Sequence, residues 1–191
     1  MTEQPVEPSI MADEAPPPAA ASSEPIPATQ SQTGKYDNYP EVEKAFIYEV
    51  HSTIAKYNAA ETDLQRSKVM RDRNAELLNL LGGYEVRDWV GVIDTVGANG
   101  EGKAYVSVEL FPGIQVKTWN NALSDTGDST LIPDSDPMYD ALLGVTPGDE
   151  VIFSGTLFAD PNETLRTTNM TETFSVRSPE FLMQFWAIST P

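Results

Sequence analysis

The stretch Pro147–Phe158 constrains the fold of this chain more than any other, because it joins a tight turn to a bent strand. Pro147, Gly148 and Asp149 supply the fixed φ and the permissive glycine of a turn. The residues after them alternate between apolar and polar, which predicts a strand with one buried face. Gly155 interrupts that strand, and an internal glycine is typical of the bulge at which a barrel strand bends.

The rest of residues 84–191 has the same alternating pattern. The expected strands are Val86–Ile93, Lys103–Leu110, Ile114–Asn120 and Asp149–Phe158, with a last one formed by Thr173–Val176 and Phe181–Ile188. Asp136 before Pro137 predicts the start of a short helix, Met138–Val145, after the third strand. Five strands with a helix between the third and the fourth follow the order of an oligonucleotide/oligosaccharide-binding (OB) type barrel. We therefore expect a mainly β fold with a five-stranded OB-like barrel at 84–191.

Residues 39–82 follow a helical period instead. Val42, Phe46, Val50 and Ile54 recur at every fourth position. This spacing places them on one face of an amphipathic helix. We expect this partner helix face to pack on the barrel or on a second copy of the chain.

The ends of this helical region carry their own signals. Asp37 or Asn38 is expected to cap its start, Glu41 and Glu43 suit the positive end of the helix dipole, and Gly82 suits its end. A single helix over this region would be about 60 Å long, which is longer than a small barrel is wide. The sequence therefore predicts either a long amphipathic helix or a helical hairpin that breaks near 58–62. Its charged run, residues 66–73, is interpreted as a solvated face with pairs one turn apart.

Residues 1–38 form the third part of the predicted organisation. They are rich in Pro, Ala and Glu and contain only isolated apolar residues. Such a segment cannot bury enough apolar surface to order its backbone, so we expect a disordered tail. The N-terminus shows no signal-peptide pattern, and no run of about 18 apolar residues predicts a transmembrane segment. Localisation stays open: cytoplasmic by default, periplasmic or secreted if a signal has been removed.

The charge of the chain restricts its ligands. The net charge is −17, and residues 82–191 hold sixteen acidic and five basic residues. A nucleic-acid-binding surface gains affinity by neutralising phosphates with Lys and Arg. An acidic barrel repels such a polyanion, so nucleic acid is not an expected partner.

Trp119, Asn120 and Asn121 form the most unusual polar and aromatic cluster. Two amides at a strand end could hydrogen-bond a sugar or a peptide while the indole stacks on it. The alternative is that Trp119 fills the barrel and the asparagines satisfy loop backbone groups. The three residues are the candidate ligand-binding site.

Asp125 and Asp128 lie in the loop that follows, close to Gly127. Carboxylates on a glycine-containing loop can bind calcium, although the spacing does not match an EF-hand. Asx turns, in which an Asp side chain bonds to the nearby backbone, explain the same residues. Calcium is the only metal that the sequence suggests, and no cofactor is expected.

The inventory for catalysis is short. The chain has no cysteine and one histidine, His51, which lies in the helical region. A Ser-His-Asp arrangement or a metal triad would need further groups. No glycine-rich phosphate loop connects a strand to a helix. We therefore expect no catalytic residues and no enzyme activity.

Several of these segments resemble an uncharacterised bacterial domain family with an OB-like barrel. The matching pieces lie between Trp89 and Phe185: Trp89–Ile93, Thr118–Asp125, Thr130–Ile132, Gly148–Gly155 and Pro179–Phe181. The family has no established activity, so the resemblance implies a fold and no catalytic residues.

These observations predict a non-enzymatic binding or adaptor module that acts through protein–protein contacts, with self-association through the helix as one form. A glycan- or small-molecule-binding barrel that uses Trp119, Asn120 and Asn121 is one alternative. An acidic mimic of nucleic acid, which the net charge of −17 allows, is another.

Overall fold

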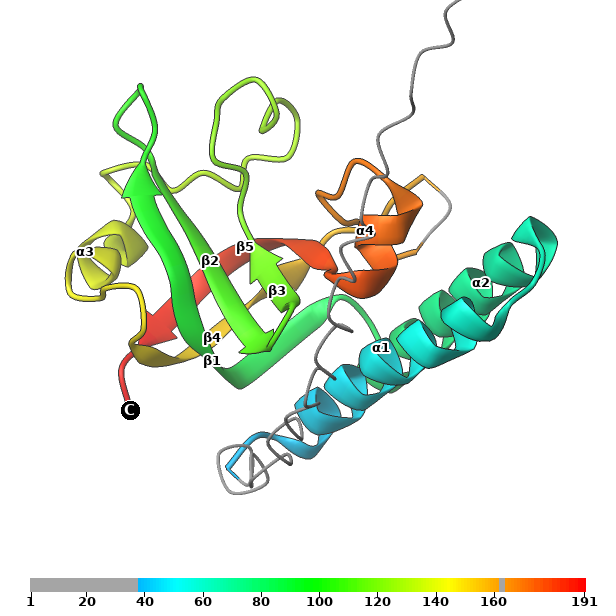
Figure 1. Cartoon of the computed structure of the whole chain (residues 1–191). Helices are drawn as coiled ribbons and strands as arrows, with labels where there is room; N and C mark the ends of the chain where they lie inside the picture. Colours follow the sequence, from blue (N-terminus) through cyan, green and yellow to red (C-terminus); the bar gives the residue numbers. More distant parts are fainter. Residues whose placement is uncertain (1–37, 162–163) are drawn as a thin grey trace, which may run out of the picture. The chain divides into compact units, whose positions relative to one another are not determined.

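The structure is a computed structural model, and it describes residues 38–161 and 164–191. The predicted tail, 1–38, lies outside the described residues except for Asn38. Within the described part, five strands form a closed barrel in the order β1-β2-β3-β5-β4 (Figure 1). The strands are β1 (Glu85–Ala98), β2 (Ala104–Phe111), β3 (Ile114–Lys117), β4 (Glu150–Leu157) and β5 (Glu180–Ser189).

Neighbouring strands of the barrel are antiparallel except β3 and β5, which are parallel. The helix α3 (Pro137–Leu143) lies between β3 and β4 in the chain, at the position that the sequence predicts. Its N-terminus is capped by Asp136, whose Oδ1 accepts a hydrogen bond from Met138 N at 2.9 Å. This architecture confirms the predicted fold class and is consistent with an OB-like barrel.

The helical region is a hairpin of α1 (Glu41–Ala59) and α2 (Asp63–Leu81). The chain breaks at 60–62, inside the predicted interval. The break is fixed by a capping box, in which Thr62 Oγ1 accepts from Gln65 N while Gln65 Oε1 accepts from Thr62 N. Gly82 ends α2 with a φ of 64°, which glycine adopts without strain. Figure 1 shows the hairpin on the opposite side of the barrel from α3.

Two local predictions are wrong. The N-cap of α1 is Pro40, which makes no side-chain capping bond, so Asn38 does not take this role, and Asp37 lies outside the described residues. A proline can start a helix because its φ is already helical and its missing N–H would be unpaired there. The segment Thr173–Val176 is not a strand but part of the short helix α4 (Glu172–Arg177), which Thr171 caps. Four alternating residues are too few to separate the two periods, and the capping residue decides the outcome.

The strand β4 bends at Gly155, as its sequence predicts. Its register with β5 shifts between Ser154 and Gly155. A Cβ atom at Gly155 would lie 2.5 Å from the carbonyl oxygen of Gln184 and 2.5 Å from Met183 Cε. The absence of a side chain is therefore what allows the two strands to approach here.

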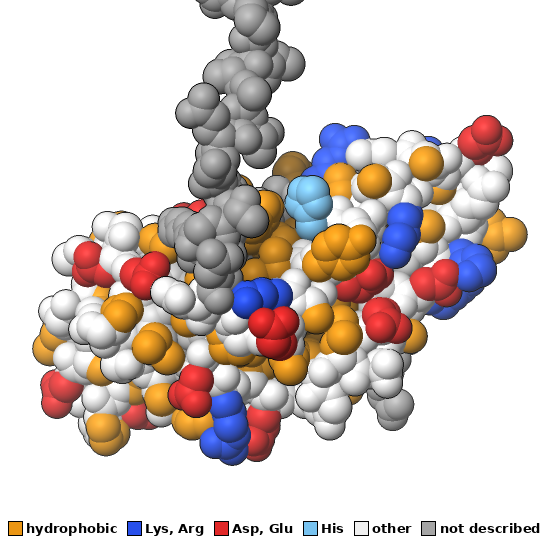
Figure 2. All heavy atoms as spheres, turned by 90° about the horizontal axis from the view of Figure 1, so that it is seen from below, with side chains coloured by type: hydrophobic (Ala, Val, Ile, Leu, Met, Phe, Trp, Pro, Cys, Tyr) orange, Lys and Arg blue, Asp and Glu red, His pale blue; other side chains and the backbone are white. Residues whose placement is uncertain are grey.

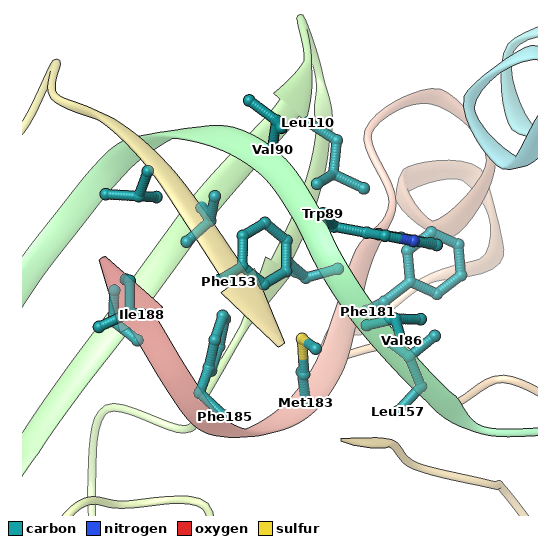
Figure 3. Close-up of a cluster of buried hydrophobic side chains, with 14 of the residues drawn as sticks. Val86, Trp89, Val90, Leu110, Phe153, Leu157, Phe181, Met183, Phe185 and Ile188 are labelled. Atoms are coloured by element: carbon teal, nitrogen blue, oxygen red, sulfur yellow. The ribbon is translucent and has the colours of Figure 1, made fainter. Parts of the chain in front are cut away.

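The interior of the barrel is filled by side chains. Figure 3 shows Val86 and Trp89 of β1, Phe153 of β4, and Phe181 and Phe185 of β5 directed toward one another. The predicted inward positions of β2, which are Ala104, Val106, Val108 and Leu110, are all buried. One hydrophobic cluster continues from these strands into α1 through Phe46 and Val50. Among the described residues, no helix is both long and apolar enough to cross a membrane.

Candidate functional site

The predicted partner helix face lies mostly against the barrel of the same chain. Phe46 and Val50 are completely buried, Ile54 is half-buried, and Val42 is 45% exposed. The ring of Phe46 lies 5.1 Å from that of Trp89 and 5.1 Å from that of Phe181. The middle of this face therefore belongs to the core of the chain, and Val42 is its well-exposed member.

Glu43 lies beside this face and is fully buried, although the sequence favours it as a dipole-stabilising surface residue. Its Oε2 accepts a hydrogen bond from Val90 N at 2.9 Å. Its Oε1 is also buried and has no hydrogen-bond partner among the described residues. Burial raises the pKa of the carboxyl to about 8, against the opposing effect of the hydrogen bond from Val90. Glu43 is therefore mostly protonated at neutral pH.

An apolar hollow lies on another side of α1, where the helix meets the barrel. Its volume is about 240 Å³, and it is lined by Tyr39, Lys44, Ile47, Tyr48, His51 and Phe111. The ring of His51 meets that of Phe111 edge-on at 5.6 Å. Figure 2 shows the histidine, in pale blue, beside a group of hydrophobic side chains. We call these six residues the α1 hollow.

Sequence reasoning did not identify the α1 hollow. Four of its residues, Lys44, Ile47, Tyr48 and His51, recur at helical spacing, which is a second and shorter stripe on α1. That spacing was the available signal. The sixth residue, Phe111, comes from the end of β2, and only the fold brings it to the helix.

Trp119 is half-buried, and it is held by the loop that follows it. Its Nε1 donates to Asp128 Oδ2 at 2.8 Å, and its backbone N donates to Thr130 Oγ1 at 2.9 Å. Asp128 also pairs with Arg166 at 2.7 Å, and the guanidinium of Arg166 lies 5.8 Å from the centre of the indole ring. The structure thus brings Trp119 together with Asp128 and Arg166, in a cluster that joins two loops.

Asn120 and Asn121 are exposed, and their side chains bond to each other and to the backbone of Ser124 rather than to Trp119. Asn121 Nδ2 donates to Asn120 Oδ1 at 3.0 Å, and Asn121 Oδ1 accepts from Ser124 N at 2.9 Å. These bonds shape the start of the loop. A ligand at these three residues stays a prediction of the sequence.

Asp125 is buried and shapes the end of the same loop. Its Oδ1 accepts from Thr130 N and Oγ1 at 2.6 and 2.7 Å, and its Oδ2 accepts from Leu131 N at 3.2 Å. The carboxylates of Asp125 and Asp128 are thus both engaged within the chain. In the described ranges, no group of three or more His, Asp or Glu residues is placed to hold a metal ion. The geometry gives the predicted calcium site no support.

The charged run on α2 is solvated in part. Arg66 pairs with Asp63 at 2.9 Å, and Lys68 pairs with Asp72, as expected for a surface helix. Arg73 is instead 2% exposed, and its Nη1 donates to the carbonyl oxygen of Ser175 in α4 at 2.9 Å. Burial lowers the pKa of Arg73 to about 10, and the charge of Glu49 opposes this shift. Arg73 therefore joins the hairpin to α4.

Comparison with known proteins adds no relative. No protein-family model matches the sequence, and no curated protein matches it either. The resemblance to a bacterial family of OB-like barrels is therefore not confirmed.

Proposed function

We propose that this chain is a non-enzymatic module that binds another protein through the α1 hollow. The observation that carries the proposal is the hollow itself, which is apolar and is formed where the helical hairpin meets the barrel. Tyr48 stands at this hollow with 73% of its surface exposed. Exposed aromatic side chains beside an apolar depression are typical of the anchor points of protein interfaces.

The barrel itself offers less support for a ligand site. Its interior holds the side chains of Trp89, Phe153 and Phe181, so a ligand would have to bind on the outside (Figure 3). The fold that we propose is an OB-like barrel related to the bacterial family that its sequence resembles. Here the barrel acts as a scaffold that presents the hairpin.

The partner that we propose carries an apolar side chain flanked by basic residues. The apolar side chain would fill the α1 hollow. The basic residues complement a chain of net charge −17, whose barrel region holds sixteen acidic and five basic residues. Charge of opposite sign accelerates association and selects partners, so binding should weaken as salt is added.

Photo-crosslinking tests this proposal. A photoreactive phenylalanine analogue replaces Tyr48 in one full-length variant and Leu123 in a second. Leu123 is a matched control because it is an exposed hydrophobic residue, 87% exposed, in a loop away from the α1 hollow. We expect a discrete protein to be crosslinked from position 48 and not from position 123.

Binding of that protein, once purified, is then titrated against the wild type, Tyr48→Ala and Leu123→Ala. Tyr48→Ala should weaken binding by about tenfold or more, the usual effect of losing an interface anchor, while Leu123→Ala should not. Equal crosslinking from both positions, no crosslinking from position 48, or equal affinities of the two alanine variants would overturn the proposal.

A further inference from the structure

Glu43 holds the helical hairpin to the barrel at a gap in the sheet. At Val90, β1 is paired with Ile152 of β4, whereas the pairing of β1 with β2 begins only at Val92. The N–H of Val90 donates to Glu43 Oε2 at 2.9 Å. A side chain of α1 thus takes the hydrogen-bonding position that a neighbouring strand would otherwise fill.

The second oxygen of this carboxyl makes the contact dependent on protonation. Oε1 of Glu43 is buried without a hydrogen-bond partner among the described residues. A protonated carboxyl leaves one neutral polar group unpaired there, whereas an ionised carboxyl leaves a buried charge with a single hydrogen bond, which costs much more. The contact therefore favours the neutral acid.

Within the part of the chain that the structure describes, no ion pair compensates the charge if Glu43 ionises. The charged and titratable groups on the surrounding elements are engaged elsewhere or exposed: Glu41 pairs with Lys44, His51 contacts Phe111, Arg87 pairs with Glu85, Asp88 is exposed, Glu109 accepts from Gly113 N, Glu180 pairs with Lys117, and Arg73 bonds to Ser175. Movement of α1 away from β1 would solvate the ionised carboxyl. Such a movement would also separate Phe46 from Trp89.

We propose that Glu43 is a proton-controlled latch, which closes the helical hairpin on the barrel while its carboxyl is protonated and releases α1 when the proton is lost to solvent. The latch uses groups that the α1 hollow does not include, so it stands independently of the proposed function. Since burial raises the pKa of Glu43 to about 8, the release lies just above neutral pH.

The test is an NMR titration of the full chain between about pH 6 and pH 10, a range that brackets the release and lies well above the ordinary pKa of glutamate. It follows the ¹³C shift of the Glu43 carboxyl and the hydrogen-exchange protection factor of the Val90 amide. We expect the carboxyl to titrate with a midpoint near 8. Over the same range, the protection factor of Val90 should fall by about tenfold or more, as expected for a local opening.

Two variants separate the latch from a general effect of alkali. Glu43→Gln keeps the shape and the acceptor for Val90 but cannot ionise, so the Val90 amide should stay protected throughout. Glu41→Gln removes a carboxylate that is 90% exposed on the same turn of α1, and it should behave as the wild type. A Glu43 carboxyl that titrates below pH 6, or an alkaline loss of protection that persists in Glu43→Gln, would overturn the latch. If Glu43→Gln does not fold, the midpoint in the wild type decides alone.

Discussion

Single residues in this chain have structural roles that their residue type alone does not reveal. Gly155 is needed because the strands β4 and β5 lie too close together here to leave room for a side chain. The sequence indicates this close approach by placing a glycine inside a strand. The position of Trp119 is also well defined in the structure. In the alternating pattern it lies opposite Val116 and Thr118, which indicates only a side chain that leans outward. What holds it is Asp128, nine residues later in the chain, together with Arg166. The alternating pattern contains no information on such partners.

Trp119→Phe tests whether this residue is scaffold or site. The change keeps most of the aromatic surface and removes the indole N–H, whose hydrogen bond from Nε1 to Asp128 Oδ2 is 2.8 Å long. We expect a loss of about 1.5 to 3 kcal/mol in unfolding free energy, the range for hydrogen bonds to charged groups, measured by urea denaturation. Asn120→Ala is the control. Because Asn120 is exposed, the unfolding free energy of this variant should differ from that of the wild type by less than about 0.5 kcal/mol. Equal stability of the wild type and Trp119→Phe would show that the bond does not support the loop.

Among the elements, α1 shows most clearly how burial divides a regular pattern. Its predicted face begins with Val42, which is 45% exposed, and continues with Phe46, which is completely buried between Trp89 and Phe181. The helical period places both residues on one face, but only the position of the barrel determines where coverage begins.

Phe46→Ala and Val42→Ala measure that division. Phe46→Ala should reduce the unfolding free energy by about 3 to 5 kcal/mol, because it empties an aromatic position in the core. Val42→Ala removes a side chain that is still 45% exposed, and we expect a change below about 1 kcal/mol. Thermal or urea unfolding of the two variants gives the comparison. Similar losses in both would mean that the whole face is covered, by the barrel and by a second copy of the chain.

The elements also show how far sequence reasoning reaches. Local signals were sufficient for the hairpin break at 60–62, for the cap of α3 at Asp136 and for the bend at Gly155. They failed at Thr173–Val176, where the stretch is shorter than either period needs. The α1 hollow and the latch could not be predicted from the sequence for another reason. His51 contacts Phe111, and Glu43 contacts Val90, only once the barrel has closed.

For the molecule as a whole, one buried carboxyl links folding to pH. Glu43 has a pKa of about 8 in the folded chain, against 4.5 for an unperturbed glutamate. Between these two values the folded chain holds a proton that the unfolded chain has released. The contribution of Glu43 is therefore fully present below about pH 4.5 and is lost as pH rises through about 8.

The wild type should therefore lose stability relative to Glu43→Gln as pH rises. The difference in unfolding free energy between the two should change by about 1.4 kcal/mol per pH unit, which is the value for one proton. The change should run from about pH 5 to pH 8 and level off above it. Urea unfolding at half-unit steps of pH gives this difference. Because the other carboxyls titrate alike in both proteins, subtraction isolates Glu43. A difference that is constant with pH would mean that Glu43 is already ionised in the folded chain, with water reaching it at the junction of α1 and β1.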